Sequence, residues 1–121
     1  MNNKFNVGDI VLICSKNCII GIVINDYYYF KNQYDIRTIF NNTLFDIPTS
    51  QLKLFTKDDL LLKIERLNNI EKINKEEYSA NIYLKDNDDI WLYRFHIGNM
   101  NQKQLIDKAY NKAVDDLKIK L

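Results

Sequence analysis

Few side chains in this chain could carry acid–base or metal chemistry. His96 is the only histidine, and Cys14 and Cys18 are the only cysteines. General acid–base catalysis needs an imidazole beside a nucleophile or an orienting carboxylate, and no sequence motif supplies that neighbour. The C-x3-C spacing of the cysteines has no second ligand pair, so a zinc site would be incomplete. We therefore expect two buried thiols, no metal, no cofactor and no enzymatic activity.

Acidic residues gather in the stretch Asp86-Asn87-Asp88-Asp89. This density of carboxylates resembles a cation loop, but the stretch lacks the glycine and the distal glutamate of an EF-hand. Asp and Asn also favour tight turns, because their side chains hydrogen-bond the nearby backbone. We expect the turn of a β-hairpin here.

The composition is that of an ordinary globular chain. Its 121 residues are 46% hydrophobic and 27% charged, with a net charge of +1. No apolar run approaches the roughly 20 residues that span a bilayer, and the polar start MNNKFN is unlike a signal peptide. These features favour a cytoplasmic protein without membrane contact. The balanced charge argues against a dedicated nucleic-acid binder, because phosphate-binding surfaces concentrate Lys and Arg.

The elements that must position these residues begin with an all-β segment. Residues 5–55 contain short apolar runs separated by turn signals and show no helical period, which is typical of β-structure. A domain is expected over residues 1–55. Its five predicted strands are residues 9–14, 18–25, 27–30, 34–40 and 51–54.

Three local patterns in this segment resemble the Src-homology-3-like small barrels of the KOW, Tudor and CarD-like kind. They are VGDIV at residues 7–11, GIV at 21–23 and IPTSQLKL at 47–54. Gly8 permits a tight entry turn, and Gly21 permits a sharp bend or the close approach of another backbone. The resemblance implies a fold and a binding role, but it names no ligand, since such barrels bind peptides, nucleic acids and other proteins.

The first hairpin of the predicted barrel is apolar on both faces. One face can fill the barrel, and the other must be covered by something else. We expect the second half of the chain to cover it, and the alternative is a homodimer. The residues of this outer face are Ile10, Leu12, Ile20 and Ile22, with Ile10 pairing with Ile22 and Leu12 with Ile20.

A second domain is expected over residues 56–121, sharing one core with the barrel. Thr56 followed by acidic residues is typical of a helix start, and a helical stripe of Leu and Ile follows it. A hairpin is predicted from residues 78–85 and 90–97, and a last helix from Asn101, where Asn101 and Gln104 have the spacing of a capping box. The predicted fold class is therefore α+β, with a five-stranded Src-homology-3-like small β-barrel followed by a helix, β-hairpin, helix unit packed on it.

Two regions offer side chains for binding. If Lys85 pairs with Ile90, one hairpin face collects basic, aromatic and hydrogen-bonding residues. In the stretch NDYYYF, a loop over residues 31–33 would pair Tyr27 with Arg37, and strand alternation then puts Tyr27 and Tyr29 on one face with Arg37. The candidate partner-binding residues are Tyr27, Tyr29, Arg37, Tyr83, Lys85, Leu92, Arg94 and His96.

The leading functional prediction is a non-catalytic binding module that acts through protein–protein contacts. The residue usage is typical of AT-rich coding, so a small bacterial, phage or mobile-element accessory or inhibitor protein, for example of the anti-CRISPR type, is also predicted. The alternative is a nucleic-acid-binding protein that stacks bases on the barrel aromatics and uses Arg94 and His96.

Overall fold

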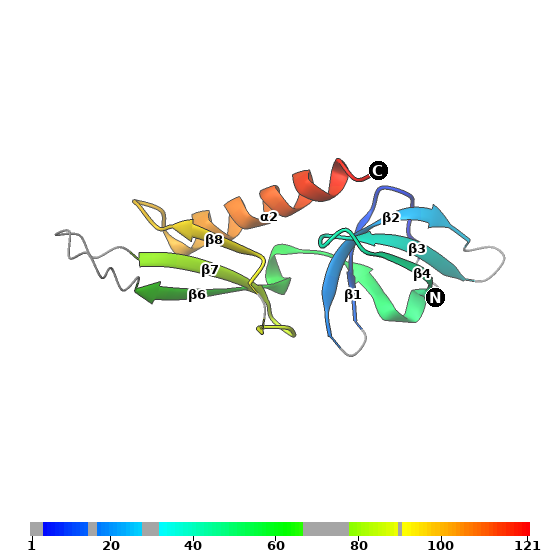
Figure 1. Ribbon diagram of the computed structural model, residues 1–121, viewed down its shortest axis with the longest axis horizontal. Helices are drawn as coiled ribbons and strands as arrows, with labels where there is room; N and C mark the ends of the chain where they lie inside the picture. The colour runs from blue at the N-terminus through cyan, green and yellow to red at the C-terminus, as the bar shows by residue number, and fades with distance from the viewer. Residues whose placement is uncertain (1–3, 15–16, 28–31, 67–77, 90) are drawn as a thin grey trace. The chain divides into compact units, whose positions relative to one another are not determined.

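The computed structural model describes residues 4–14, 17–27, 32–66, 78–89 and 91–121. Within them the chain forms eight strands in two antiparallel sheets and one α-helix, α2 (Figure 1). It divides into two units, the first made of Met1–Thr56 with Lys112–Leu121 and the second of Lys57–Asn111. The predicted α+β class with a helix, hairpin, helix unit is wrong, because a third strand stands where the first of those helices was expected.

The first unit contains a five-stranded sheet with the order β4-β3-β2-β1-β5. A 3-10 turn, Thr49–Gln51, follows Pro48 and leads into the last strand, as the Pro-Thr-Ser sequence favours. The strands are β1 (Ile10–Ile13), β2 (Ile19–Asp26), β3 (Gln33–Thr38), β4 (Thr43–Pro48) and β5 (Leu52–Leu54).

The first hairpin has the predicted register, in which Ile10 pairs with Ile22 and Leu12 with Ile20. Cys18 is buried, as expected, but Cys14 is exposed, because β1 ends at Ile13 and Cys14 lies beyond the pairing. Neither cysteine is in a disulfide.

The second hairpin corrects the interpretation of the aromatic stretch. The strand predicted over residues 27–30 lies largely outside the described residues, and β3 pairs directly with β2. Arg37 is opposite Ile22, not Tyr27, so the predicted pairing of Tyr27 with Arg37 is wrong. A register shift between Val23 and Asn25 moves the later pairs by one residue, which counting from a loop could not anticipate. β4 was not predicted at all.

The core of the first sheet lies on the face that carries Val11, Ile13 and Val23. Tyr34 is fully buried there, and its hydroxyl accepts a hydrogen bond from the Phe5 backbone N–H at 2.9 Å. A buried tyrosine needs such a partner, and this bond ties residues before β1 to β3.

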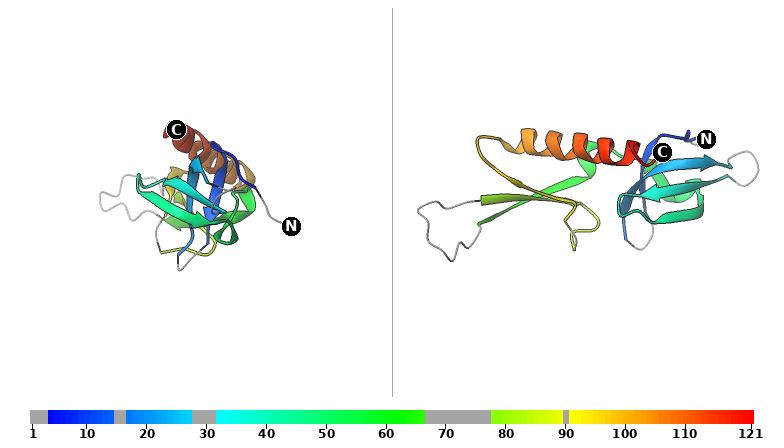
Figure 2. Two further views of the ribbon diagram at one scale, coloured as in Figure 1. Left: turned by 90° about the vertical axis from the view of Figure 1, so that its right-hand side faces the viewer. Right: turned by 45° about the horizontal axis from the view of Figure 1, so that its top comes forward.

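The opposite face of the first hairpin is covered within the chain itself. Leu12, Ile20 and Ile22 are at most 2% exposed. The last part of α2 belongs to the same unit, and its Ala113 and Leu117 are fully buried. The Lys120 ammonium also donates a hydrogen bond to the Asn41 side-chain oxygen. Figure 2 shows this end of the helix beside the first sheet.

The second unit replaces the helix expected from Thr56 with a 3-10 turn, η2 (Lys57–Asp59), and a strand, β6 (Leu60–Arg66). Strand β6 pairs along its whole length with β7 (Tyr78–Leu84), and β7 also pairs with β8 (Tyr93–His96). The apolar residues from Leu60 to Ile64 fit a helical stripe and a buried strand equally well. The backbone pairing with a strand distant in sequence decides between them.

The hairpin of β7 and β8 has the predicted register, with Ser79 opposite His96 and Asn81 opposite Arg94. The chain turns at Lys85 and Asp86, where a bridge between Leu84 and Asn87 closes the turn, so the turn begins one residue before the predicted stretch Asp86–Asp89.

The helix α2 spans Gln102–Lys118 and begins with the predicted capping box. The Asn101 side chain accepts from the Gln104 N–H, and the Gln104 side chain accepts from the Asn101 N–H, each at 2.9 Å. Its buried stripe is Leu105, Ala109, Ala113 and Leu117, each at most 1% exposed. Within the described residues, no helix is long and apolar enough to cross a membrane.

Candidate binding surfaces

The face of the second sheet that points away from α2 carries three of the eight residues predicted to bind a partner, namely Tyr83, Arg94 and His96. We call this face the open face; its exposed residues lie on the edge strands, whereas its β7 residues are at most 8% exposed. The alternation of the strands places Lys63 of β6, Ser79, Asn81 and Tyr83 of β7, and Arg94 and His96 of β8 on it. Leu92 precedes β8 and is half-buried, whereas Lys85 follows β7 and is exposed.

Arg94 is held in place on the open face by two neighbours. Its Nε donates to the Asn81 side-chain oxygen at 2.8 Å, and its guanidinium lies 5.8 Å from the centre of the Trp91 ring. Asn81 is only 1% exposed, so its amide is a fixed anchor. A side chain that is already positioned loses less conformational entropy when a ligand binds.

Lys63 is held on the same face by an acid and a ring. Its ammonium lies 3.0 Å from the Asp88 carboxylate and 4.9 Å from the centre of the Tyr83 ring. The hydrogen bond from Lys63, followed by its charge, lowers the pKa of Asp88 from its ordinary value of 3.8. One carboxylate of the acidic stretch, that of Asp88, therefore forms an ion pair with Lys63 of β6.

His96 and Ser79 are opposite each other in the pairing of β7 with β8. The Ser79 hydroxyl is buried and makes no hydrogen bond with any described residue. A serine nucleophile needs a base that takes its proton, and that bond is missing here. Among the described residues, no three His, Cys, Asp or Glu side chains converge on a metal position either.

The predicted binding residues of the first unit are not brought together. Tyr27 is 39% exposed at the end of β2, and Tyr29 lies outside the described residues. Arg37 is half-buried in β3, and its Nε is buried without a hydrogen-bond partner among the described residues.

A second surface, which the sequence analysis missed, lies on the hairpin of β3 and β4. Tyr34 pairs with Ile47 and Ile36 with Leu44, so Phe45 and Asp46 together stand opposite Asp35 in a β-bulge. Phe45 is 67% exposed. We call Phe45, together with Phe40, which is 48% exposed in the preceding turn, the bulge surface.

The bulge is fastened by a buried carboxylate. Asp35 is 4% exposed, and it accepts hydrogen bonds from the Asp46 backbone N–H at 3.0 Å and from the Asn25 side-chain amide at 3.1 Å. Asp46 has a φ of 56°, a conformation that costs energy in a residue other than glycine and persists only where neighbours enforce it. The bond to Asp35 supplies that constraint and keeps Phe45 in the bulge.

Comparisons of the chain with known proteins found no related sequence or structure. No family model, no curated protein and no solved structure matches the chain. The likeness of the first half to Src-homology-3-like barrels therefore stays a sequence resemblance.

Proposed function

We propose that the chain is a non-catalytic binding module whose protein partner contacts the bulge surface. The observation that supports this most is the exposure of Phe45 on a bulge held by a buried carboxylate. An exposed phenylalanine gains free energy only when a partner covers it, and aromatic anchors dominate protein interfaces. A small accessory or inhibitor protein of a phage or mobile element would use such a surface in the cytoplasm of its host.

The test is capture of a partner from the lysate of a low-GC bacterial host, treated with nuclease and identified by mass spectrometry. The wild-type chain is compared with Phe45→Ser and with Ile64→Ser, a control whose side chain is 50% exposed on β6 of the second unit. A partner retained by wild type and the control but lost by Phe45→Ser supports the proposal. Equal capture by all three chains, or no capture by any, contradicts it.

The role of the bulge is tested separately with Asp35→Ala. Loss of the carboxylate leaves the Asp46 N–H without its partner, so the free energy of unfolding should fall by about 1–3 kcal/mol. Affinity for the captured partner should fall as well, because Phe45 is no longer held in place. Chemical denaturation and a binding titration measure the two effects. Affinity unchanged in a folded variant would show that the bulge geometry is unimportant.

A second candidate is nucleic-acid binding on the open face. It is favoured by the anchored Arg94 and by Trp91, which is 49% exposed beside it and could stack on a base. Affinity for a mixed-sequence oligonucleotide should then fall with salt, and Arg94→Ala should reduce the slope of log affinity against log salt by about one. Lys118→Ala, which removes an exposed charge from the end of α2, is the control. Binding that ignores salt or Arg94 would dismiss this candidate.

A further inference from the structure

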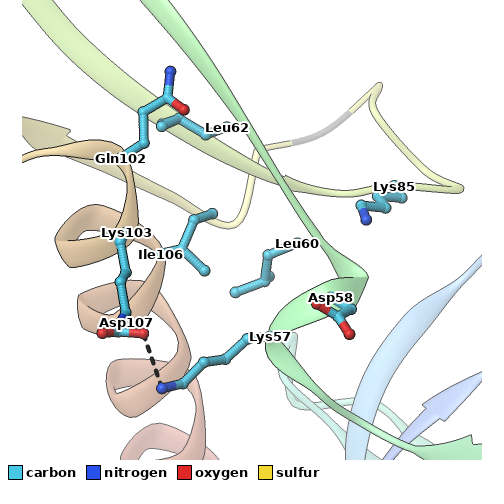
Figure 3. Close-up of a pocket in the computed structure, with 9 residues that line it drawn as sticks. All are labelled: Lys57, Asp58, Leu60, Leu62, Lys85, Gln102, Lys103, Ile106 and Asp107. Atoms are coloured by element: carbon cyan, nitrogen blue, oxygen red, sulfur yellow. Dashed lines mark ion pairs between the residues drawn. The ribbon is translucent and has the colours of Figure 1, made fainter.

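A pocket of about 490 Å³ lies on the α2 side of the second sheet, opposite the open face (Figure 3). It is formed by η2, β6, the residue after β7 and the first turns of α2, so it lies wholly within the second unit. Its volume falls in the range of small-molecule sites, roughly 300–1,000 Å³. Of the predicted binding residues that the structure describes, Lys85 alone lines it.

The floor of the pocket is apolar. Leu60 and Leu62 come from one face of β6, and Ile106 comes from α2. Figure 3 shows Leu60 and Ile106 pointing toward one another between the strand and the helix. Leu62 and Ile106 are half-buried, so this floor keeps apolar surface that a ligand could cover.

The rim of the pocket is charged, with lysines in excess. Lys57 pairs with Asp107 at 2.8 Å, so these two charges largely offset one another. The other charged residues of the lining are Lys85, Lys103 and Asp58, so positive charge exceeds negative charge by one. The Lys85 backbone N–H donates to the Asp59 carbonyl oxygen at 2.9 Å, which fixes this lysine beside the 3-10 turn.

We propose that this pocket binds a small amphipathic carboxylate. The apolar body of the ligand covers Leu60, Leu62 and Ile106, and its carboxylate is paired by Lys103 of α2; Figure 3 shows Lys85 on the opposite side of the pocket. An ammonium is a compact charge on a flexible stem, so this lysine can follow a carboxylate without a strict geometry. This site is independent of the proposed protein contact, which lies in the other unit.

The ligand class is tested on the full chain with octanoate, acetate, octanol, octylammonium and inorganic phosphate. Binding is followed by calorimetry and by backbone amide shifts in NMR spectra. Octanoate should bind saturably, with its largest shifts around Leu60, Lys103 and Ile106. Acetate and phosphate should bind more than about tenfold more weakly, because they leave the floor uncovered. Octanol and octylammonium should bind about two- to fivefold more weakly than octanoate, because neither carries the negative charge that the lysine pairs.

Variants test the position of the site. Lys103→Gln should weaken octanoate about two- to fivefold and leave octanol unchanged, whereas Lys118→Gln, on the same helix outside the pocket, should change neither. Ile106→Trp should fill the pocket and abolish binding, with the thermal midpoint and amide spectrum reporting that the chain still folds. Absence of saturable octanoate binding, equal binding of phosphate or octylammonium, or full affinity in folded Ile106→Trp would overturn the proposal. Phe45→Ser should bind octanoate normally, so failure here is distinct from failure of the proposed protein contact.

Discussion

At the scale of single residues, the structure depends on positions where the available space admits only one type of residue. Gly21 is the clearest. A Cβ added there would lie 2.5 Å from Ile36 Cγ2 and 2.8 Å from the Arg37 backbone oxygen. The close approach of another backbone that the sequence suggested for Gly21 is therefore confirmed, and the backbone that approaches is that of β3.

Gly21→Ala should lower the free energy of unfolding by about 3 kcal/mol, the upper end of overpacking effects, because a backbone oxygen cannot move aside as a side chain can. Urea denaturation measures the change. Gly98→Ala is the control, since its φ is 53° but no atom lies within 4 Å of the added carbon, so only a backbone cost of about 1 kcal/mol applies. Equal losses in the two variants would show that the contact at Gly21 is relaxed at no cost.

The ion pair between Lys63 and Asp88 gives a pH prediction. Because the pKa of Asp88 is lowered in the folded chain, the pair is complete above the ordinary value of 3.8 and is lost as the pH falls through the lowered value. Lys63→Met should raise the pKa of Asp88 toward 3.8, whereas Lys85→Met, near the same turn, should leave it unchanged. An NMR titration of the Asp88 side-chain carbonyl measures both. Unchanged titration in Lys63→Met would mean that the pair does not form in solution.

At the scale of elements, the second sheet is organised around its central strand. All six residues from Ser79 to Leu84 are buried, whereas β8 alternates between half-buried and exposed residues. On the side of the sheet that faces α2, Ile82 of β7 is fully buried and Ile64 of the edge strand β6 is 50% exposed. The burial of a residue in this sheet is therefore set by the position of its strand as well as by its face.

Ile82→Ala should cost about 2–5 kcal/mol of unfolding free energy, because it removes buried methylenes and leaves a cavity. Ile64→Ala, the same change on the same face, should cost well under half of that, since half of its side chain is already in water. Chemical denaturation of both variants provides the comparison. A larger loss for Ile64→Ala would contradict the assignment of β6 as the edge strand.

At the scale of the whole molecule, α2 supplies core residues to both units. Leu105 belongs to the second unit and Leu117 to the first, and both are at most 1% exposed. Their spacing along one buried stripe means that a single helix serves two hydrophobic cores. The chain therefore does not divide at one point in the sequence, and its last ten residues complete the unit that its first residues begin.

Leu117→Ala and Leu105→Ala should each cost about 2–5 kcal/mol, but in different units. Hydrogen exchange should accelerate mainly in β1 and β2 for Leu117→Ala and mainly in β6 and β7 for Leu105→Ala. Native-state exchange followed by NMR separates the two patterns. Identical patterns in both variants would show that the two units unfold together as one cooperative body.

The sequence by itself determined those features that depend on a short hairpin connection or on the first turn of a helix. The pairing of Ile10 with Ile22, the register of Asn81 with Arg94 and the capping box at Asn101 were predicted and are present, and the turn predicted over Asp86–Asp89 begins one residue earlier, at Lys85. Each follows from a short loop or a local hydrogen bond whose geometry the chain carries with it.

Only the tertiary structure decided the rest. Leu60–Ile64 became a strand because β7, beginning at Tyr78, offered a pairing edge, and a period that suited either structure could not reveal that edge. Phe45 became exposed because Asp35, ten positions earlier, fastens the bulge that holds it. In the first case the deciding partner is a strand distant along the chain, and in the second it is a buried side chain across the hairpin; in both cases its hydrogen bonds outweigh the local preference of the residues that they arrange.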